Sequence, residues 1–481
     1  MTRRQGEQPQ WLNRVYTRII HPLFERRHYQ GFADRLLRYQ RMEGLSLQAN
    51  RELQWRALVR LLQHAYDTTS FYRHRFEAAG LRPSEIASPS DLERIPPLTR
   101  DDIREHLSGL QSNSYRASEL SHAATGGTTD TPVPLLRSRE AVREKMAIQW
   151  RFNSWAGFLP GDKVLYVWGA RQDFSENPSW RWRLYSRHLM RQVYAPTSLF
   201  NESVLESYRQ SMNRFRPRVI YAYPTPLALF CEYLRDSRKP YHRPRTAICT
   251  AESLLPGQRR VIEEVLGCPV FEHYGSREFA MIAGECERHQ GLHLNTAAAY
   301  VEFLPFPGFE GEGLHELVVT DLLNYGMPLI RYRINDCALL GPEQCACGRG
   351  FPLLGQITGR VTEVFHLANG DSVPGISLHR VITEDCPGLR KIQLIQDTLH
   401  DFRVRFVPTR TFTQADLATL RSRLGQRFGE SVRWTFEQVA DIKRERSGKT
   451  RFCISYLTRP AIRGDEGSTG EPGWGPTLPG G

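Results

Sequence analysis

The sequence predicts an α/β protein in which a helical lead-in precedes a large domain and a small α+β domain follows it. Three observations support this fold class: helical spacing in the first part of the chain, alternating β-rich and helical runs in the middle, and a compact mixed pattern at the end. We therefore expect a helical lead-in over 1–115, an α/β core over 116–358, a C-terminal domain over 359–458 and a disordered tail over 459–481.

The lead-in is expected to be mostly helical. Residues 51–80 carry apolar side chains near helical spacing and stop at Gly80, which suits a helix C-terminus. Ser90 and Thr99 each precede acidic residues, and both are expected to cap the start of a helix.

The middle of the chain alternates strand and helix. Expected strands are KVLYVWGA, RVIYAYP, TAICTAE and PVFEHYG, and expected helices between them are 201–215, 227–236 and 257–267. This alternation predicts βαβ units in a largely parallel sheet, which binds ligands at the carboxyl ends of its strands. Residues 315–340 then read as two strands around a Gly-Met-Pro turn.

The C-terminal domain begins after a boundary at 358–363. We expect a hairpin (365–373), a helix (377–385), two strands (392–397 and 402–408), a second helix (415–429) and a closing strand (452–457). The tail from Arg463 is rich in Gly, Pro and Ser and is expected to be disordered.

Composition narrows the functional classes. The 481 residues are 40% hydrophobic and 24% charged, as in ordinary globular proteins. The net charge is +12, but the arginines are spread along the chain, so no nucleic-acid partner is expected. No apolar run is long enough to cross a membrane, and no apolar stretch follows the basic N-terminus, so we expect a cytoplasmic protein.

Four short motifs carry groups suited to nucleotide chemistry. Each motif also has an ordinary structural explanation. In the order in which the motifs are named below, these explanations are a surface turn, a solvent-facing turn, an edge strand with solvated arginines, and a basic loop. The motifs are ATGGTTDTP (124–132), HYGSRE (273–278), RYRIND (331–336) and RSGKTR (446–451).

In this order, the motifs resemble those of the adenylate-forming acyl/aryl-CoA synthetases. The resemblance is to the phenylacetate-CoA ligase-like branch, including capsular-polysaccharide-cluster and coenzyme F390 synthetase-like members, and it covers roughly residues 50–455. The stretch TAESLLPGQRRVIEEVLGCPVFEHYGSRE resembles the family's adenine-binding region and its Tyr-Gly-x-x-Glu motif. TGR (358–360) is similar to the start of the hinge about which the small, mobile C-terminal domain turns.

The resemblance implies a two-step reaction. A carboxylic acid attacks the α-phosphorus of MgATP to give an acyl-adenylate and pyrophosphate, and a thiol, usually coenzyme A, then displaces AMP. Two alternatives stay open: an adenylyltransferase that leaves AMP on its acceptor, as in F390 synthetase-like members, and acyl activation for a carrier or sugar acceptor in polysaccharide or natural-product biosynthesis. A homodimer is also left open.

The resemblance also implies roles for particular residues. Lys449 bridges the carboxylate and the α-phosphate, Glu278 holds Mg²⁺, Asp336 binds the ribose and Arg360 belongs to the hinge beside the nucleotide. The phosphates are bound by Thr125, Gly126, Gly127, Thr128 and Thr129, the adenine by Ala251, Glu252, Tyr274 and Gly275, and the acid by Tyr221, Tyr223 and Pro224.

The chain departs from the family pattern at two motifs. Asp130 stands where many relatives have Gly and then Lys in the phosphate loop, so one cation is missing and one anion is added. The hinge continues as Val361-Thr362-Glu363 instead of Asp-Asp. The two tyrosines suit an aryl acid or an ordinary core equally well, so the choice between aryl and alkyl acids stays open.

Three of the nine cysteines stand apart from the others. Cys286 and His293 precede Cys345 and Cys347, and the resemblance extends to branch members in which a similar set carries zinc. Three thiolates and one imidazole suit a closed, structural zinc site. Packed thiols are the alternative, and His289 competes with His293 as the fourth ligand.

Overall fold

A computed structural model gives the structure of the protein. The described residues are 31–124, 132–168, 181, 184–196, 201–305, 313–360, 364–368, 372–374, 386, 388–409, 412–429, 431–442 and 453–457.

The lead-in is helical, as predicted. Its helices are α3 (Phe32–Arg41), α4 (Leu47–Thr68), α5 (Ser70–Ala78), α6 (Pro89–Glu93), α7 (Arg100–Glu105) and α8 (Leu107–Leu110). Thr99 caps α7 in a capping box with Asp102, and Gly80 follows α5 with φ 61°, both as expected. The expected cap at Ser90 is wrong, because Ser88 caps α6 and Ser90 lies inside that helix.

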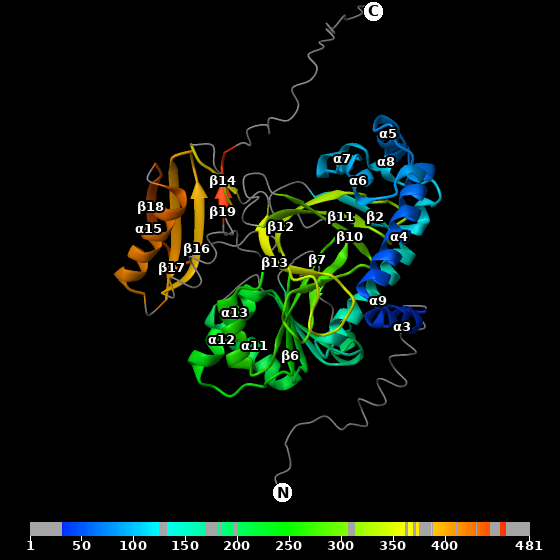
Figure 1. The fold of residues 1–481 in the computed structure, drawn as a ribbon. Coiled ribbons are helices and arrows are strands. Elements are labelled where there is room, and N and C mark those ends of the chain that lie inside the picture. The colour runs from blue at the N-terminus through cyan, green and yellow to red at the C-terminus, as the bar shows by residue number, and fades with distance from the viewer. Residues whose placement is uncertain are drawn as a thin grey trace, which may run out of the picture.

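The core is an eleven-stranded sheet with the order β10-β11-β12-β13-β9-β8-β7-β6-β5-β3-β4 (Figure 1). The parallel part contains β3 (Val164–Trp168), β4 (Gln192–Pro196), β5 (Val219–Ala222), β6 (Thr246–Thr250) and β7 (Val270–Ser276). The antiparallel part contains β8 (Ala280–Glu285), β9 (Leu292–Leu294), β10 (Ala299–Pro305), β11 (Leu314–Asp321), β12 (Tyr332–Leu340) and β13 (Leu353–Arg360).

The expectation of a largely parallel sheet therefore holds for only half of it. A three-residue connection joins β7 to β8, and so short a connection forces an antiparallel pair. The two strands expected over 315–340 are confirmed as the neighbours β11 and β12.

Helices cover both faces of the parallel part. Helices α11 (Glu202–Phe215), α12 (Pro224–Ser237) and α13 (Pro256–Leu266) pack on the face that includes Ile220 and Cys249. Helix α9 (Arg139–Trp155) lies against the other face, near Val219 and Ile248. The lead-in helices pack instead on the antiparallel part, beside β2 (Pro134–Ser138) and its partner β1 (Leu120–Ala124) (Figure 1).

The described residues of the C-terminal unit form a four-stranded sheet, a two-stranded sheet and one helix. Its elements are β14 (Val364–His366), β15 (Ser372–Pro374), β16 (Leu389–Gln396), β17 (Asp401–Pro408), α15 (Gln414–Phe428), β18 (Arg433–Gln438) and β19 (Cys453–Ser455). The hairpin, the strands and the second helix occur where predicted, whereas the helix expected over 377–385 and the tail lie outside the described residues. Strand β18 pairs with β17 but was not predicted. Its side chains are all partly or fully exposed, so its sequence does not show the apolar pattern of a buried strand. In the described part of the chain, no helix has both the length and the apolarity to span a membrane.

Candidate functional site

Two of the sequence motifs meet at the middle of the sheet. The Tyr274 hydroxyl, on β7, donates a hydrogen bond to Oδ2 of Asp336 over 2.8 Å, although 62 residues separate the two. In the register of β12 and β13, Asp336 lies opposite Arg360. Asp336 sits within β12, and pairing with β13 continues that strand beyond it. The hydrogen bond fixes the carboxylate at the position expected to bind the ribose.

Gly275 lies at a register shift between β7 and β8. A Cβ atom on this residue would approach the backbone oxygen of Ala280 to 2.0 Å, which no side chain can do. Glycine is thus required here for the close approach of two backbones. This register shift is a β-bulge, and it precedes the turn that carries Glu278, the residue predicted to hold Mg²⁺.

Glu278 is only 7% exposed, in the turn between β7 and β8. The Tyr332 hydroxyl donates to its Oε1 over 3.4 Å. The Nζ of Lys145 donates to the backbone oxygen of Glu278 (2.8 Å) and to the carboxylate of Asp321 (2.6 Å). Lys145 and Asp321 were missed in the sequence analysis; their only signal there was the scarcity of lysine, which occurs six times in the chain.

A third missed residue is Arg137 on β2. It is partly buried, and its Nε atom has no hydrogen-bond partner among the described residues. The pKa of Arg137 is lowered, first by burial and then by the neighbouring Arg277. The carboxylates of Glu278 and Asp321 raise it, but by less. The strand follows the 124–132 motif closely along the chain, so Arg137 is a candidate for the expected phosphate site.

The residues expected at the adenine follow β6. Ala251 adopts φ 69°, a conformation that is rare for a residue with a side chain. Oε2 of Glu252 accepts a hydrogen bond from the backbone N–H of Thr225 at the start of α12 (3.3 Å). Oε1 of Glu252 is buried without a partner in the described structure, so it remains available to a ligand donor.

Two of the residues expected to bind the acid, Tyr221 and Tyr223, belong to an aromatic cluster around Trp168. Tyr221 lies 6.1 Å from Trp168 between ring centroids, and Tyr223 lies 4.5 Å from the same ring. Burial raises the pKa of Tyr221, and Gln149 of α9 donates to its hydroxyl (3.4 Å). Pro224 is the first residue of α12, a position that favours proline for structural reasons.

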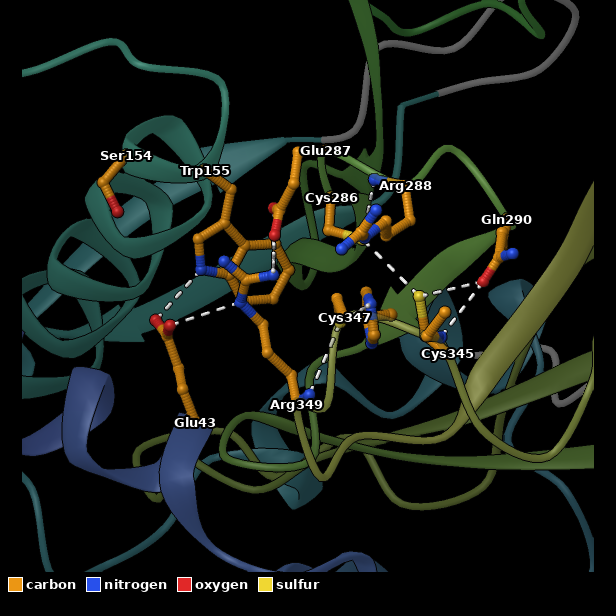
Figure 2. Close-up of polar contacts among 12 residues, drawn as sticks. Glu43, Ser154, Trp155, Cys286, Glu287, Arg288, Gln290, Cys345, Cys347 and Arg349 are labelled. Carbon is orange, nitrogen blue, oxygen red and sulfur yellow. Dashed lines mark hydrogen bonds and ion pairs between the residues drawn. The ribbon is translucent and has the colours of Figure 1, made fainter.

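The four predicted zinc ligands lie together, and Figure 2 labels the three cysteines among them. The ligand atoms of Cys286, His293, Cys345 and Cys347 all fall within 4.8 Å of one another. The Cys286 and Cys345 sulfurs are 3.7 Å apart, and Cys347 Sγ is 3.3 Å from His293 Nε2. Ligands about 2.3 Å from a tetrahedral zinc ion are separated by about 3.7 Å, so the donor set fits this metal.

The surroundings of this cluster also suit a cation. The sulfur of Cys286 accepts a hydrogen bond from the backbone N–H of Arg288, and the sulfur of Cys347 accepts one from the backbone N–H of Arg349, each over 3.4 Å (Figure 2). Burial raises the pKa of the Cys286 thiol to about 12, so a bound cation is needed to keep it a thiolate. Burial lowers the pKa of His293 to about 4, which leaves the imidazole neutral.

The competing His289 points away from this cluster. Its ring lies 5.0 Å from that of Phe271, and its Nδ1 pairs with Glu285 over 3.3 Å. His293, in contrast, lies in the cluster, and the Trp155 ring of α9 packs against it with 5.4 Å between ring centroids. Arg349 stacks on Trp155 at 4.8 Å and forms ion pairs with Glu43 and Glu287 (Figure 2).

Part of the predicted site lies outside the described residues. This applies to the phosphate loop, the altered hinge and the basic loop, namely Thr125, Gly126, Gly127, Thr128, Thr129, Asp130, Val361, Thr362, Glu363 and Lys449. The backbone of Arg360 is described, but its side chain is not. The roles of these residues stay predictions.

Comparisons with known proteins agree with the geometry. Residues 366–456 match the family model described as CapK C-terminal domain. Protein CapK of Staphylococcus aureus is 24% identical over 410 residues, covering 84% of this chain and 89% of that protein. Phenylacetate-coenzyme A ligase of Pseudomonas putida is 29% identical over 329 residues, covering 66% of this chain and 72% of that protein.

Solved structures show the same fold. The 2-hydroxyisobutyryl-CoA ligase, in its postadenylation state with 2-HIB-AMP, has a TM-score of 0.68 at 21% identity, covering 86% of this chain and 91% of that one. In its thioesterification state, with 2-HIB-AMP and CoA, the TM-score is 0.56 at 22% identity, with the same coverage. The chain is thus similar in sequence to CapK and to phenylacetate-CoA ligases, and its fold is that of solved CoA ligases.

Proposed function

We propose that this protein is an AMP-forming acid–thiol ligase that activates a carboxylic acid with MgATP and transfers the acyl group to coenzyme A. The observation that carries the proposal is the contact between Tyr274 and Asp336, because it unites two distant motifs at the place where the family binds its nucleotide. Similarity to phenylacetate-CoA ligases supports the same reaction class. The cytoplasm supplies both ATP and coenzyme A, and we place the enzyme there.

The first half-reaction forms a mixed anhydride. A carboxylate oxygen of the acid attacks the α-phosphorus, and the bond to the bridging oxygen breaks so that pyrophosphate leaves with its electron pair. We assign the orientation of the ribose to Asp336, which Tyr274 holds, and the binding of the phosphates to Glu278 and Arg137, whose charges act on each other. The Mg²⁺ that accompanies ATP neutralises charge on the phosphates. Lys449 is proposed to bridge the carboxylate and the α-phosphate.

The second half-reaction forms the thioester. The thiolate attacks the carbonyl carbon of the acyl-adenylate, and AMP leaves with the electrons of the carbonyl–oxygen bond. We assign the change between the two steps to rotation of the C-terminal unit at the hinge beside Arg360, which would withdraw Lys449 and admit the thiol.

Pyrophosphate release tests the proposal directly. The purified protein is incubated with MgATP and a panel of aryl and alkyl acids, with and without coenzyme A, while pyrophosphate and AMP are measured. Acid-dependent pyrophosphate with AMP release only in the presence of coenzyme A is the expected result. Pyrophosphate without free AMP under any thiol would indicate nucleotidyl transfer instead, and no acid-dependent pyrophosphate would refute the ligase.

An acceptor other than coenzyme A is the second candidate. It is favoured by the match of residues 366–456 to the CapK C-terminal domain, because the C-terminal unit is the part that meets the acceptor in the second step. A carrier-bound thiol or a sugar amine of polysaccharide or natural-product biosynthesis would fill this role. Rapid adenylate formation with slow, coenzyme A-independent AMP release would support it.

Arg137→Ala is expected to raise the KM for ATP about 10- to 100-fold, because a charged hydrogen-bond donor contributes about 1.5–3 kcal/mol. The phosphate loop carries Asp130 where relatives have a cation, and Arg137 would supply that charge. Arg139→Ala is the matched control, since Arg139 is exposed and donates to the backbone oxygen of Ser118. Equal KM values for the two variants would remove Arg137 from the phosphate site.

The four clustered ligands are proposed to hold a structural zinc ion. Protein purified without chelator is expected to contain about one zinc per chain by elemental mass spectrometry. Cys347→Ser should lose the metal and melt at a lower temperature, whereas Cys268→Ser, at a cysteine outside the cluster, should retain the metal. Metal-free wild-type protein with an unchanged melting temperature would contradict the proposal.

A further inference from the structure

Arg151, on α9, is fully buried without a carboxylate bonded to it. Its side chain is 0% exposed, and its Nε and Nη1 atoms have no hydrogen-bond partner among the described residues. The third nitrogen, Nη2, donates to Oδ1 of Asn295 over 3.1 Å. Burial lowers the pKa of Arg151 to about 10, so the guanidinium stays charged at neutral pH. A buried charge is costly unless an opposite charge accompanies it, so this one requires an explanation.

The immediate surroundings of the guanidinium are aromatic and neutral. Its Cζ atom lies 4.7 Å from the ring centroid of Phe152, 5.7 Å from that of Trp155 and 4.8 Å from that of Phe351. Aromatic faces attract a cation but carry no net charge. Three rings and one amide therefore ease the burial of Arg151 without neutralising it.

The same rings connect Arg151 to the four predicted zinc ligands. The ring of His293 lies 5.4 Å from that of Trp155 and 6.4 Å from that of Phe351, measured between centroids. Asn295, which accepts the hydrogen bond from Arg151, follows His293 by two residues. The guanidinium thus lies about one aromatic ring away from the metal-ligand cluster.

The neighbouring charges already have partners. Arg349, also beside the cluster, is paired with Glu43 over 3.3 Å and with Glu287 over 2.9 Å (Figure 2). Glu43 raises the pKa of Arg151 from a distance, but its carboxylate is bonded to Arg349 and to the indole N–H of Trp155 (3.0 Å). These carboxylates therefore offset the charge of Arg349 and leave that of Arg151.

A metal ion in the cluster would create the missing negative charge. Zinc binds cysteine as the thiolate and histidine as the neutral imidazole. Three thiolates contribute three negative charges, and a divalent ion cancels two of them. One negative charge then remains on the cluster, and the guanidinium of Arg151 holds one positive charge beside it.

We propose that Arg151 is the buried counter-cation of the metal cluster, a positioning residue whose fixed charge favours three thiolates around a divalent ion. This inference rests on the proposed zinc site. It explains why an arginine is buried in an aromatic environment with two of its nitrogens unbonded. It also means that metal binding and the packing of α9 depend on each other, because the metal-free cluster offers Arg151 no compensating charge.

Zinc affinity tests the inference, measured by competition with a chromophoric chelator on the full chain. Arg151→Met and Arg151→Gln remove the charge and should each bind zinc about 10- to 100-fold more weakly, as is usual when a group that supports metal ligands is lost. Arg151→Lys keeps the charge and should stay within about threefold of the wild type. Glutamine retains a donor for Asn295, so agreement between the two neutral variants assigns the loss to charge.

Melting temperatures with and without metal separate this role from simple packing. With zinc bound, Arg151→Met should melt lower than the wild type, because a ligand that binds more weakly stabilises less. After zinc is removed with EDTA, Arg151→Met should melt no lower than the metal-free wild type, because methionine replaces an uncompensated buried charge.

Arg331→Met is the matched control, at a buried arginine that has its own carboxylate. The Arg331 side chain is 3% exposed and pairs with Glu302 over 2.9 Å. Its replacement leaves Glu302 without that partner, so the variant should melt lower both with and without zinc. Its affinity for zinc should equal that of the wild type.

The outcomes distinguish this inference from the zinc site on which it rests. Neutral variants of Arg151 that bind zinc as tightly as the wild type, or an equal loss of affinity in Arg331→Met, would overturn the inference while the zinc site stands. Metal-free Arg151→Met that melts well below metal-free wild type would give Arg151 a packing role and also overturn it. Wild-type protein that binds no zinc would refute the zinc site, and the inference with it.

Discussion

Lys145→Met is expected to lower the free energy of unfolding by about 3–5 kcal/mol, because it strands a buried charge. The Lys145 side chain is 7% exposed and that of Asp321 is 1% exposed, and the two are joined over 2.6 Å. Methionine matches the length of lysine but cannot pair with the carboxylate. Urea denaturation followed by fluorescence measures the loss.

The double variant Lys145→Met/Asp321→Asn is the control for this experiment. Asparagine retains an oxygen to accept the backbone N–H of Leu323, as Oδ1 of Asp321 does over 3.1 Å, but carries no charge. The double variant should therefore regain much of the stability. A single variant that loses less than about 1 kcal/mol would show that water reaches this pair and that it is not truly buried.

Glu278→Gln is expected to reduce the rate of acid-dependent pyrophosphate release about 100-fold or more, because Glu278 is proposed to hold Mg²⁺ at the phosphates and the amide carries no charge to do so. The backbone oxygen that binds Lys145 is unchanged, so the fold should be preserved. Pyrophosphate release measured over a range of Mg²⁺ concentrations should show a weaker dependence on the metal, with an unaltered melting temperature.

Glu264→Gln removes the same charge from an exposed position on α13 and should have no effect. A Glu278→Gln variant with wild-type rate and wild-type Mg²⁺ dependence would show that Glu278 does not hold the metal. The proposed ligase function would survive that result, because other carboxylates could hold the ion.

The sequence predicted well those parts of the fold in which local pattern and burial agree. Strands β3, β5, β6 and β7 are short apolar runs separated by amphipathic helices, and each was located correctly. The helix cap at Ser88 was missed, although the sequence contains a signal for it. Proline favours the first position of a helix, so Pro89 indicates that the preceding residue, Ser88, is the cap. Apart from β11 and β12, the antiparallel half was missed, because strand direction depends on connection length, which apolar periodicity does not encode.

The candidate site was predictable where a motif carried it. Tyr274, Asp336 and the four metal-ligand candidates were named from motifs, and the structure brings the partners within each group together. Lys145 and Asp321 could not be paired in advance, because 176 residues separate them and neither lies in a recognised motif. The burial of Arg151 without a bonded carboxylate likewise becomes visible only once its neighbours are in place.

Helix α9 contributes to both functional regions. Lys145, near its start, holds the backbone of Glu278, and Trp155, at its end, lies on the ring of His293. Ten residues of helix make a stiff rod of about 15 Å. The proposed zinc site and the proposed nucleotide site thus share one stiff helix, so we expect that removing the metal slows acid-dependent pyrophosphate release as well as lowering the melting temperature.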